Sequence, residues 1–510
     1  MSFLLWGVFI SFYSLVSCQT VPANFKASES HALTATSETF FGRLLAPSIE
    51  ANPGKSGFYP LQAGTDAFVA RLESVRRAEK SLDVQYYIWH DDLVGKILFY
   101  EILAAADRGV RVRLLLDDLH IGQYEELLLV LDSHPFIEVR MFNPFANRSL
   151  RFLDVFRFSQ INRRMHNKVL IADNQTAIIG GRNIGNEYFT ASPDENFGDF
   201  DVWCFGPVVK ESSQSFDLYW NHRLSVPIKE LNKREVQGTE LANLQNDLKA
   251  VEQSEEAKPY LKELAESSLA KSIENRKMHS FWGKAQVFSD SPEKVAGESY
   301  KKTSMLNQVT ALPIKSSKEI FIVSPYFIPG KNGVEYFKKK SKEGVKVTVF
   351  TNSLASNDVP LVFAGYKKYR KGLLKAGVEI YEMRPRISAQ KKKFSSSISA
   401  GARLGLHGKA YVFDRRVMFV GSMNLDPRSV ELNSEMGVLF ESPELAQRFV
   451  EMTLNELPDV AYKVTLSEGK LQWTTQEGEN EVTVDSEPEA SVWKSFKAGF
   501  LSLFVPESML

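Results

Sequence analysis

Two short stretches of the sequence carry the same polar residues at the same spacing. Both follow the pattern His-x-Lys-x4-Asp-x6-Gly-[Gly/Ser]-x-Asn. The first copy consists of His166, Lys168, Asp173, Gly180, Gly181 and Asn183, and the second of His407, Lys409, Asp414, Gly421, Ser422 and Asn424. One copy in a chain of 510 residues is a weak signal. Two complete copies indicate that the residues act together.

Alternation along an extended strand assigns different places to these residues. Residues two apart point to the same face, so His166 and Lys168 share a face, and His407 and Lys409 do the same. The aspartates lie at odd offsets from the histidines, on the opposite side and at the turn. We therefore expect Asp173 and Asp414 to form the turn and not to touch a substrate.

Two histidines and two lysines that converge fit an anion and not a metal ion, because an ammonium group repels a cation and offers no lone pair. The lysines, together with Asn183, Ser422 and Asn424, offer donors to the non-bridging oxygens of a phosphate. One imidazole can attack phosphorus and the other can protonate the departing alcohol. The residues leave open which histidine does which, and they require no cofactor.

Each imidazole also needs a carboxylate on its second ring nitrogen. Glu435, in Asn-Ser-Glu-Met-Gly, is the candidate for His407. Alignment of SEMGVLF with GDFDVWC gives Asp199 the equivalent place for His166, with Asp201 as the alternative.

The motifs lie in a repeated framework. Leu82–Ile88 reads as a strand, Leu93–Arg108 as a helix and Gly109–Leu116 as a second strand, and the same order returns at Ile320–Tyr326, Gly333–Lys342 and Gly344–Phe350. A strand–helix–strand unit suits a largely parallel sheet. The sequence thus predicts two homologous α/β halves.

The motifs resemble those of the phospholipase D superfamily, over nearly the whole chain from Gly57 on. Several stretches are more narrowly similar to the bacterial cardiolipin synthase C subgroup, among them DVQYYIWHDD, RRMHNK, GGRNIGNEYF, SPYFIPG, TNSLASNDVP and SMNLDPRS. The resemblance implies two α/β/α sandwich domains about a pseudo-two-fold axis with one shared, metal-free site. It also implies that His166 is the nucleophile, His407 the acid and base, and that the intermediate is a phosphohistidine.

The resemblance implies a membrane-associated transphosphatidylase that makes cardiolipin, with phosphatidylglycerol as acceptor and phosphatidylethanolamine as a possible donor. Three alternatives stay open: a phospholipase D that uses water, a phosphodiesterase or nuclease, and a catalytically silent lipid-binding protein. Sixty-two basic and 62 acidic residues leave no net charge, which disfavours nucleic acid. Two complete motifs disfavour a silent protein.

The chain ends carry membrane signals. Phe3–Val16 is apolar and precedes Ser17-Cys18, which resembles a lipoprotein signal with lipid on Cys18, although no basic residue precedes the apolar run. That reading predicts a lipoprotein in a bacterial envelope, facing the periplasm. Apolar residues at helical spacing in 493–504 predict an amphipathic helix, for a bilayer or for the protein body. Phe145, Phe152, Phe156 and Phe158 interleave with arginines before the first motif and suit a phospholipid or a packed core.

The pattern divides the chain into six expected segments. They are a signal at 1–18, a tether at 19–56, a first domain at 57–210, a helical insertion at 211–301, a second domain at 302–462 and a C-terminal extension at 463–510.

Overall fold

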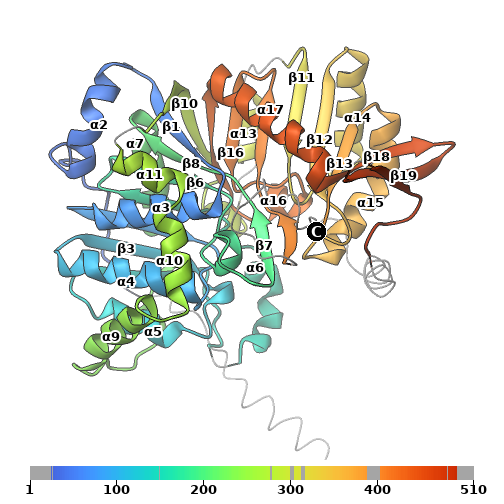
Figure 1. Ribbon diagram of the computed structural model, residues 1–510. Helices are drawn as coiled ribbons and strands as arrows, with labels where there is room; N and C mark the ends of the chain where they lie inside the picture. The colour runs from blue at the N-terminus through green and yellow to red at the C-terminus, as the bar shows by residue number, and fades with distance from the viewer. Residues whose placement is uncertain are drawn as a thin grey trace, which may run out of the picture.

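The computed structural model describes residues 25–490, apart from 26, 149, 276–277, 299–303, 312–315, 387–401 and 479. The predicted signal, Cys18 and the predicted helix at 493–504 lie outside the described residues. The two halves lie side by side, the first on the left of Figure 1 in blue to green and the second on the right in yellow to red. Each half is a sheet covered by helices on both faces.

The strands of the first half form a mixed sheet. Its spatial order is β9-β4-β3-β2-β5-β6-β8-β1. The strands are β1 (Ser56–Leu61), β2 (Ser81–Tyr86), β3 (Arg111–Asp117), β4 (Ile137–Phe142), β5 (Val169–Ala172), β6 (Thr176–Gly180), β8 (Asp201–Phe205) and β9 (Ser225–Pro227). The β2–β3 and β3–β4 pairs are parallel, as the predicted strand–helix–strand unit requires, and the other pairs are antiparallel.

The second half repeats this order. Its strands follow β10-β17-β16-β15-β11-β12-β13-β18-β19-β20. They are β10 (Phe281–Ser289), β11 (Glu319–Val323), β12 (Lys346–Asn352), β13 (Glu379–Met383), β15 (Ala410–Phe413), β16 (Val417–Gly421), β17 (Met436–Glu441), β18 (Ala461–Ser467), β19 (Lys470–Glu477) and β20 (Asn480–Val484). Antiparallel pairing of β1 with β10 joins the two sheets where they meet. This equivalence of order gives the pseudo-two-fold axis.

Helices fill both faces of the sheets. The first half has α3 (Gly64–Arg76), α4 (Leu93–Asp107), α5 (Glu125–Asp132), α6 (Phe158–Ile161) and α7 (Pro207–Trp220), and the second has α12 (Glu293–Ala296), α13 (Met305–Ala311), α14 (Gly330–Lys342), α15 (Pro360–Lys375), α16 (Pro427–Glu431) and α17 (Pro443–Val460). Leu114 and Leu116 pack toward α3 and α4, whereas Leu115 between them faces the opposite core. That second core contains residues of α7, α17 and both sheets, so the two halves share one apolar interior.

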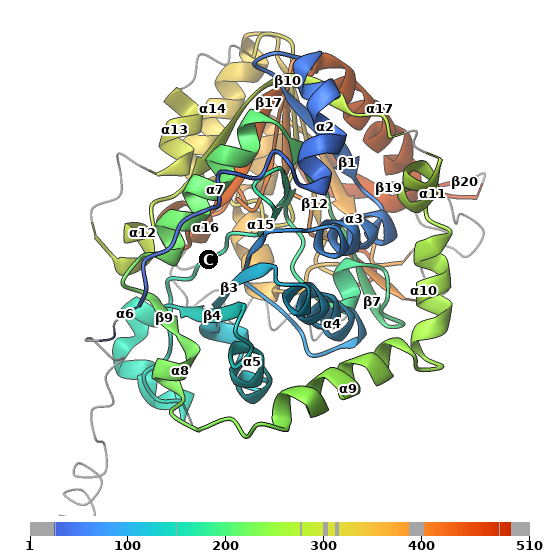
Figure 2. The same cartoon turned by 90° about the vertical axis from the view of Figure 1, so that its left-hand side faces the viewer.

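The segment predicted as a helical insertion needs correction at its ends. Four helices, α8 (Ile228–Leu231), α9 (Glu240–Glu252), α10 (Ala257–Ala265) and α11 (Ser268–Glu274), run along the outside of the first half in Figure 2. Strands β9 and β10 flank them, and each is paired within a sheet. Likewise, the expected C-terminal extension begins inside β18, which pairs with β13. Strand β9 has only three residues and is easily missed beside the helices that follow it.

The described part of the predicted tether is packed on the body. It contains α2 (Phe40–Glu50), and the side chain of Asn221 binds the backbone of Ser30 in both directions. Arg113 and Arg140 donate to the carbonyls of Ser30 and Ser28. The sequence predicted a tether at 19–56, and in its described part Arg113 and Arg140 hold the segment against the body. None of the helices in the described residues is both long enough and apolar enough to cross a bilayer.

Candidate active site

The two His-x-Lys segments lead into equivalent strands. His166 and Lys168 immediately precede β5, and His407 and Lys409 immediately precede β15. All four residues are buried, and the most exposed of them, His407, is 9% exposed. Each lysine folds back on its own histidine: Lys168 Nζ donates to the His166 carbonyl at 2.7 Å, and Lys409 Nζ donates to the His407 carbonyl. The predicted sharing of a face is confirmed in both halves.

Parallel pairing between the halves brings the two motifs to one place. The His166 amide donates to the Ser434 carbonyl at 2.9 Å, next to a parallel bridge between Met165 and Ser434. In the second half, β14 (Arg403–Leu406) pairs in parallel with β7 (Glu195–Gly198), and the His407 amide donates to the Gly198 carbonyl at 2.8 Å. Each histidine is therefore hydrogen-bonded to the opposite half.

The carboxylates consequently pair across the halves. Glu435 follows Ser434, and its Oε2 lies 2.8 Å from Nδ1 of His166. Asp199 follows Gly198, and its Oδ2 lies 2.6 Å from Nδ1 of His407. The sequence analysis identified both acids but assigned each to the histidine of its own half, which is wrong. The alternative acid, Asp201, binds Arg71 at 2.9 Å instead.

Each imidazole contacts its buried carboxylate through Nδ1. Nε2 of His166 is therefore the ring nitrogen left for a substrate, whereas Nε2 of His407 also lies 3.1 Å from Nζ of Lys409. Both carboxylates are at least 95% buried, so their hydrogen bonds fix the orientation of each ring.

The two carboxylates differ in their own partners. Ser422 donates to Oε2 of Glu435, and Ser429 donates to Oε1 at 2.9 Å. A Cβ atom at Gly181 would lie 2.3 Å from Oδ1 of Asp199, so no side chain fits there. The Gly181–Ser422 difference between the motifs therefore matches a shorter acid in one half and a longer, hydroxyl-bound acid in the other.

Two of the three predicted phosphate ligands are already occupied. The Ser422 hydroxyl binds Glu435 and accepts the Met436 amide at 3.0 Å. Asn183 accepts the Ile88 amide and donates to the Tyr188 hydroxyl, and it is 1% exposed. These two predictions are corrected: in the structure both side chains bind protein groups.

Asn424 remains available as a phosphate ligand. Its buried Oδ1 has no partner among the described residues. An amide can turn by 180° and present its N–H groups at that position instead.

The motif aspartates hold turns, as predicted. Asp173 accepts the amides of Glu79, Lys80 and Ser81 at 2.7–3.0 Å. Asp414 accepts the equivalent amides of 317, 318 and 319 at 2.9–3.0 Å. Both aspartates have positive φ, 55° and 52°, and neither contacts a histidine. They join the motif hairpins to β2 and β11.

The electrostatics distinguish the two histidines. Burial, followed by the charges of Lys168 and Lys409, lowers the pKa of His166 well below its usual value. Burial and Lys409 also lower the pKa of His407, but Asp199 counteracts them. Burial raises the pKa of Glu435 to about 7.

The remaining charges also depend on burial. Burial would raise the pKa of Asp199, but His407 and Lys409 outweigh it and lower that pKa. Burial lowers the pKa of Lys168 strongly and that of Lys409 to about 8. His407 thus faces an ionised carboxylate and accepts a proton more readily than His166.

Aromatic side chains surround the imidazoles. The Tyr87 ring lies edge-on to His166 with 4.9 Å between the ring centroids. Tyr188 and Phe197 lie 5.1 and 5.6 Å from His407 and were missed in the sequence analysis. Tyr188 belongs to GGRNIGNEYF, so its proximity to the motif was the available signal.

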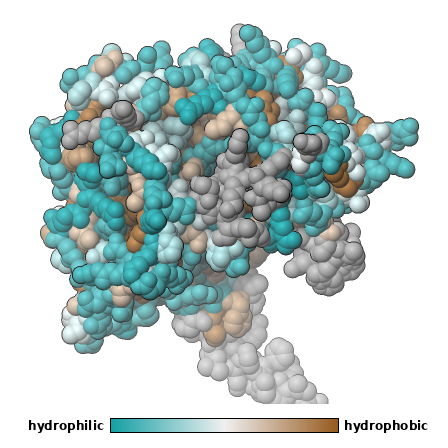
Figure 3. All heavy atoms as spheres, in the orientation of Figure 1, coloured by the Kyte–Doolittle hydropathy of each residue, from teal (hydrophilic) through white to brown (hydrophobic). Residues whose placement is uncertain are grey.

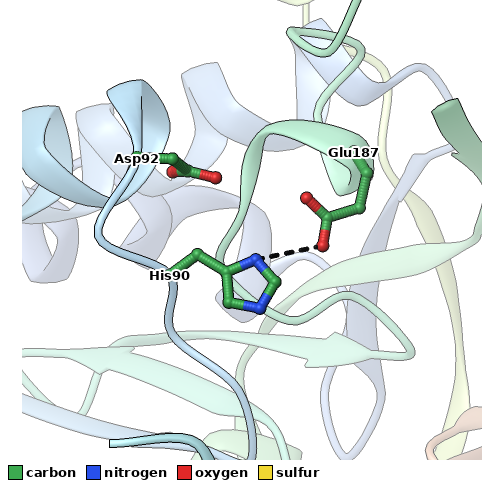
Figure 4. Close-up of side chains that lie close together, drawn as sticks. All are labelled: His90, Asp92 and Glu187. Atoms are coloured by element: carbon green, nitrogen blue, oxygen red, sulfur yellow. Dashed lines mark ion pairs between the residues drawn. The ribbon is translucent and has the colours of Figure 1, made fainter. Parts of the chain in front are cut away.

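A group of metal-type ligands includes Glu187, the residue before Tyr188. His90, Asp92 and Glu187 have ligand atoms within 4.8 Å of one another (Figure 4). His90 Nδ1 contacts Glu187 at 3.2 Å, and the Asp92 oxygens accept the amides of Gly95 and Asn186. Asp92 caps the N-terminus of α4. The group therefore packs the loop of Tyr188 against α4.

Comparisons with known proteins agree with this geometry. Residues 72–220 and 313–455 match the family described as "Cardiolipin synthase, PLD-like domain". The chain is 37% identical to cardiolipin synthase C of Escherichia coli K12 over 91% of this chain and 98% of that protein. It is 26% identical to cardiolipin synthase B of the same strain, over 76% and 77%. The crystal structure of phosphatidylserine synthase from Haemophilus influenzae has the same fold, with a TM-score of 0.54 and 13% identity over 92% of this chain and 99% of that one.

Proposed function

Because this chain belongs to the family of phospholipase D-like cardiolipin synthases, we propose that it transfers a phosphatidyl group and makes cardiolipin. Phosphatidylglycerol accepts the group, and a second phospholipid, such as phosphatidylethanolamine, donates it. One observation carries the proposal: two crossed histidine–carboxylate pairs meet two buried lysines in one site. That set of charges suits a phosphodiester anion.

The first step forms a phosphohistidine. Nε2 of His166 attacks phosphorus, the bond to the leaving alcohol breaks, and His407 gives that alcohol a proton. The pKa values support this order, because His166 is the more strongly held in the neutral, nucleophilic form. Glu435 orients His166 and stabilises the positive charge that forms on the ring.

The second step reverses the first with a new alcohol. His407, now neutral, takes the proton from a glycerol hydroxyl of phosphatidylglycerol, and that oxygen displaces His166 from phosphorus. Lys168, Lys409 and Asn424 contact the non-bridging oxygens in both steps. Hydrolysis would use the same groups with water as the acceptor, so the product distinguishes the two activities.

The proposal includes a place at the bacterial envelope. Lipid on Cys18 would hold the protein on a membrane, facing the periplasm. The membrane supplies both lipids at high local concentration, which favours an alcohol acceptor over water.

Lipid mass spectrometry tests the proposed function. The full chain is incubated with vesicles of phosphatidylglycerol and phosphatidylethanolamine, with a chelator present throughout. The variants are His166→Ala, His407→Ala and, as a matched control, His31→Ala on the surface. We expect new cardiolipin from the parent and His31→Ala only. Phosphatidic acid without cardiolipin would favour the hydrolase, and no lipid product would refute the proposal.

A further inference from the structure

We propose that an exposed apolar tip beside the active site inserts into the surface of a phospholipid bilayer. The apolar tip is defined as residues 150–158, which include 3-10 helix η2 (Arg151–Arg157) and the first residue of α6. It deepens the function proposed above and rests on it for the identity of the substrate. The occupant of this surface is a lipid bilayer and not a protein.

Large apolar side chains are gathered on the tip. Leu150 is 52% exposed, Phe152 is 70% exposed and Phe158 is 47% exposed. The other large exposed apolar residues of the described chain, such as Leu44, Leu218 and Tyr336, lie on separate elements. The segment projects at the lower edge of the molecule in Figure 1, where Figure 3 shows a hydrophobic patch. A cluster of this kind marks an interaction surface.

The arginines of the segment hold the tip and are not left for lipid headgroups. Arg148 pairs with Asp118 and Glu125, Arg151 with Asp118 at 3.1 Å, and Arg157 with Asp154 at 3.2 Å. The sequence pattern of interleaved arginines and phenylalanines therefore separates in the structure: the cations face inward and the apolar groups face outward. Phe145 is also buried, and Arg151 lies over its ring. Binding should then depend on apolar insertion and little on salt.

The tip and the catalytic histidine share one anchor. Asp117, at the end of β3, accepts the Met165 amide and binds Arg164, next to His166. The following residue, Asp118, accepts the Phe145 amide and binds Arg151 of the tip and Arg148 just before it. Insertion of the tip would thus set the catalytic strand at a fixed depth from the bilayer.

Ring contacts also connect His166 to the turn that contains Asp118. His166 contacts Tyr87, and Tyr87 contacts His120 with 5.4 Å between centroids. His120 is exposed at the end of η1 (Asp118–His120), and Arg151 donates to the Asp118 carbonyl of that turn at 2.7 Å. The outer end of this aromatic path is therefore beside the tip, where a lipid headgroup would enter.

An environment-sensitive fluorophore tests insertion directly. It is attached to Phe152→Cys or, as a matched control, to Leu218→Cys, which is 62% exposed on α7. Both variants are full chains with Cys18→Ser, and the remaining Cys204 is buried. On vesicles of phosphatidylglycerol and phosphatidylethanolamine we expect the Phe152 label to shift to the blue and brighten by about threefold or more, also in 0.5 M salt, with no change at Leu218. An unchanged Phe152 label, or a change abolished by salt, would overturn the proposal.

Activity on two forms of substrate provides the second test. The variant Leu150→Ser/Phe152→Ser/Phe158→Ser is compared with Leu44→Ser/Leu218→Ser/Tyr336→Ser. We expect the tip variant to lose about tenfold or more on vesicles and to keep its rate on a short-chain, monomeric phospholipid. Equal rates on vesicles for both variants would overturn the proposal. If the parent acts on no phospholipid, the proposed function fails, while the fluorophore still decides insertion.

Discussion

Conservative replacement of the two carboxylates tests whether the pairing crosses between the halves. Glu435→Gln and Asp199→Asn keep the size of each side chain and remove its charge. The bonds to imidazole are 2.8 and 2.6 Å long and buried. A hydrogen bond to a charged group is worth about 1.5–3 kcal/mol, which corresponds to about 10- to 150-fold in rate.

Substrates with different leaving groups distinguish the roles of the two histidines. A p-nitrophenyl phosphodiester releases a phenolate that needs no proton, whereas an alkyl phosphodiester needs an acid. Glu435→Gln should slow the first step by about 10- to 150-fold with both substrates, because it weakens the nucleophile His166. Asp199→Asn should slow the alkyl substrate by a similar factor and leave the p-nitrophenyl burst within about threefold.

Stopped-flow absorbance measures the burst, and imidazole NMR signals identify the partner of each carboxylate. Glu435→Gln should move the signals of His166, and Asp199→Asn those of His407. The reasoning is refuted if Glu435→Gln moves the signals of His407 or affects only the alkyl substrate. Equal losses from both variants with both substrates would also contradict separate roles.

Three further changes give separable results. The rate should fall as pH rises through about 8, because Lys409 is charged below its lowered pKa and neutral above it; a pH profile with a soluble phosphodiester that stays flat to pH 10 would contradict this. Asp173→Ala should lower the free energy of unfolding by about 3–4 kcal/mol, because three hydrogen bonds from backbone amides are lost at a residue with positive φ. The rate per folded molecule should stay unchanged. Asp414→Ala, at a more exposed turn, should lower the free energy of thermal unfolding by less. Gly181→Ala should displace Asp199 and reduce the rate with an alkyl phosphodiester by about tenfold or more. An unaltered rate would contradict this and show that the carboxylate can move freely.

Local spacing was enough to predict which residues converge on the candidate site and the framework that holds them. The repeated motif identified His166, Lys168, His407 and Lys409, and alternation along the strands placed Asp173 at its turn. These features depend on residues close in sequence. The strand–helix–strand repeat, read from apolar periodicity, likewise gave the two halves.

Contacts between distant segments account for the errors. Each histidine pairs with the carboxylate of the opposite half because Met165 pairs with Ser434 and β14 pairs with β7. No local pattern in the sequence encodes these pairings. Ser422 was predicted to bind phosphate because a hydroxyl suits that role, but in the structure its hydroxyl donates to Glu435. The described part of the polar segment before β1 packs through Arg113 and Arg140, whose partners are backbone carbonyls with no sequence signature.

The covalent intermediate is the most direct test of the central claim, that one histidine carries the phosphatidyl group and the other moves the proton. The full chain is mixed with the p-nitrophenyl ester of a short-chain phosphatidic acid, whose leaving group needs no proton. The protein is then quenched, digested and analysed by peptide mass spectrometry under alkaline conditions that preserve phosphohistidine. In His407→Ala, which lacks the acid and base, the account predicts a phosphatidyl adduct on the peptide that contains His166, and none in His166→Ala. An adduct on His407, or turnover without any adduct on His166, would contradict it.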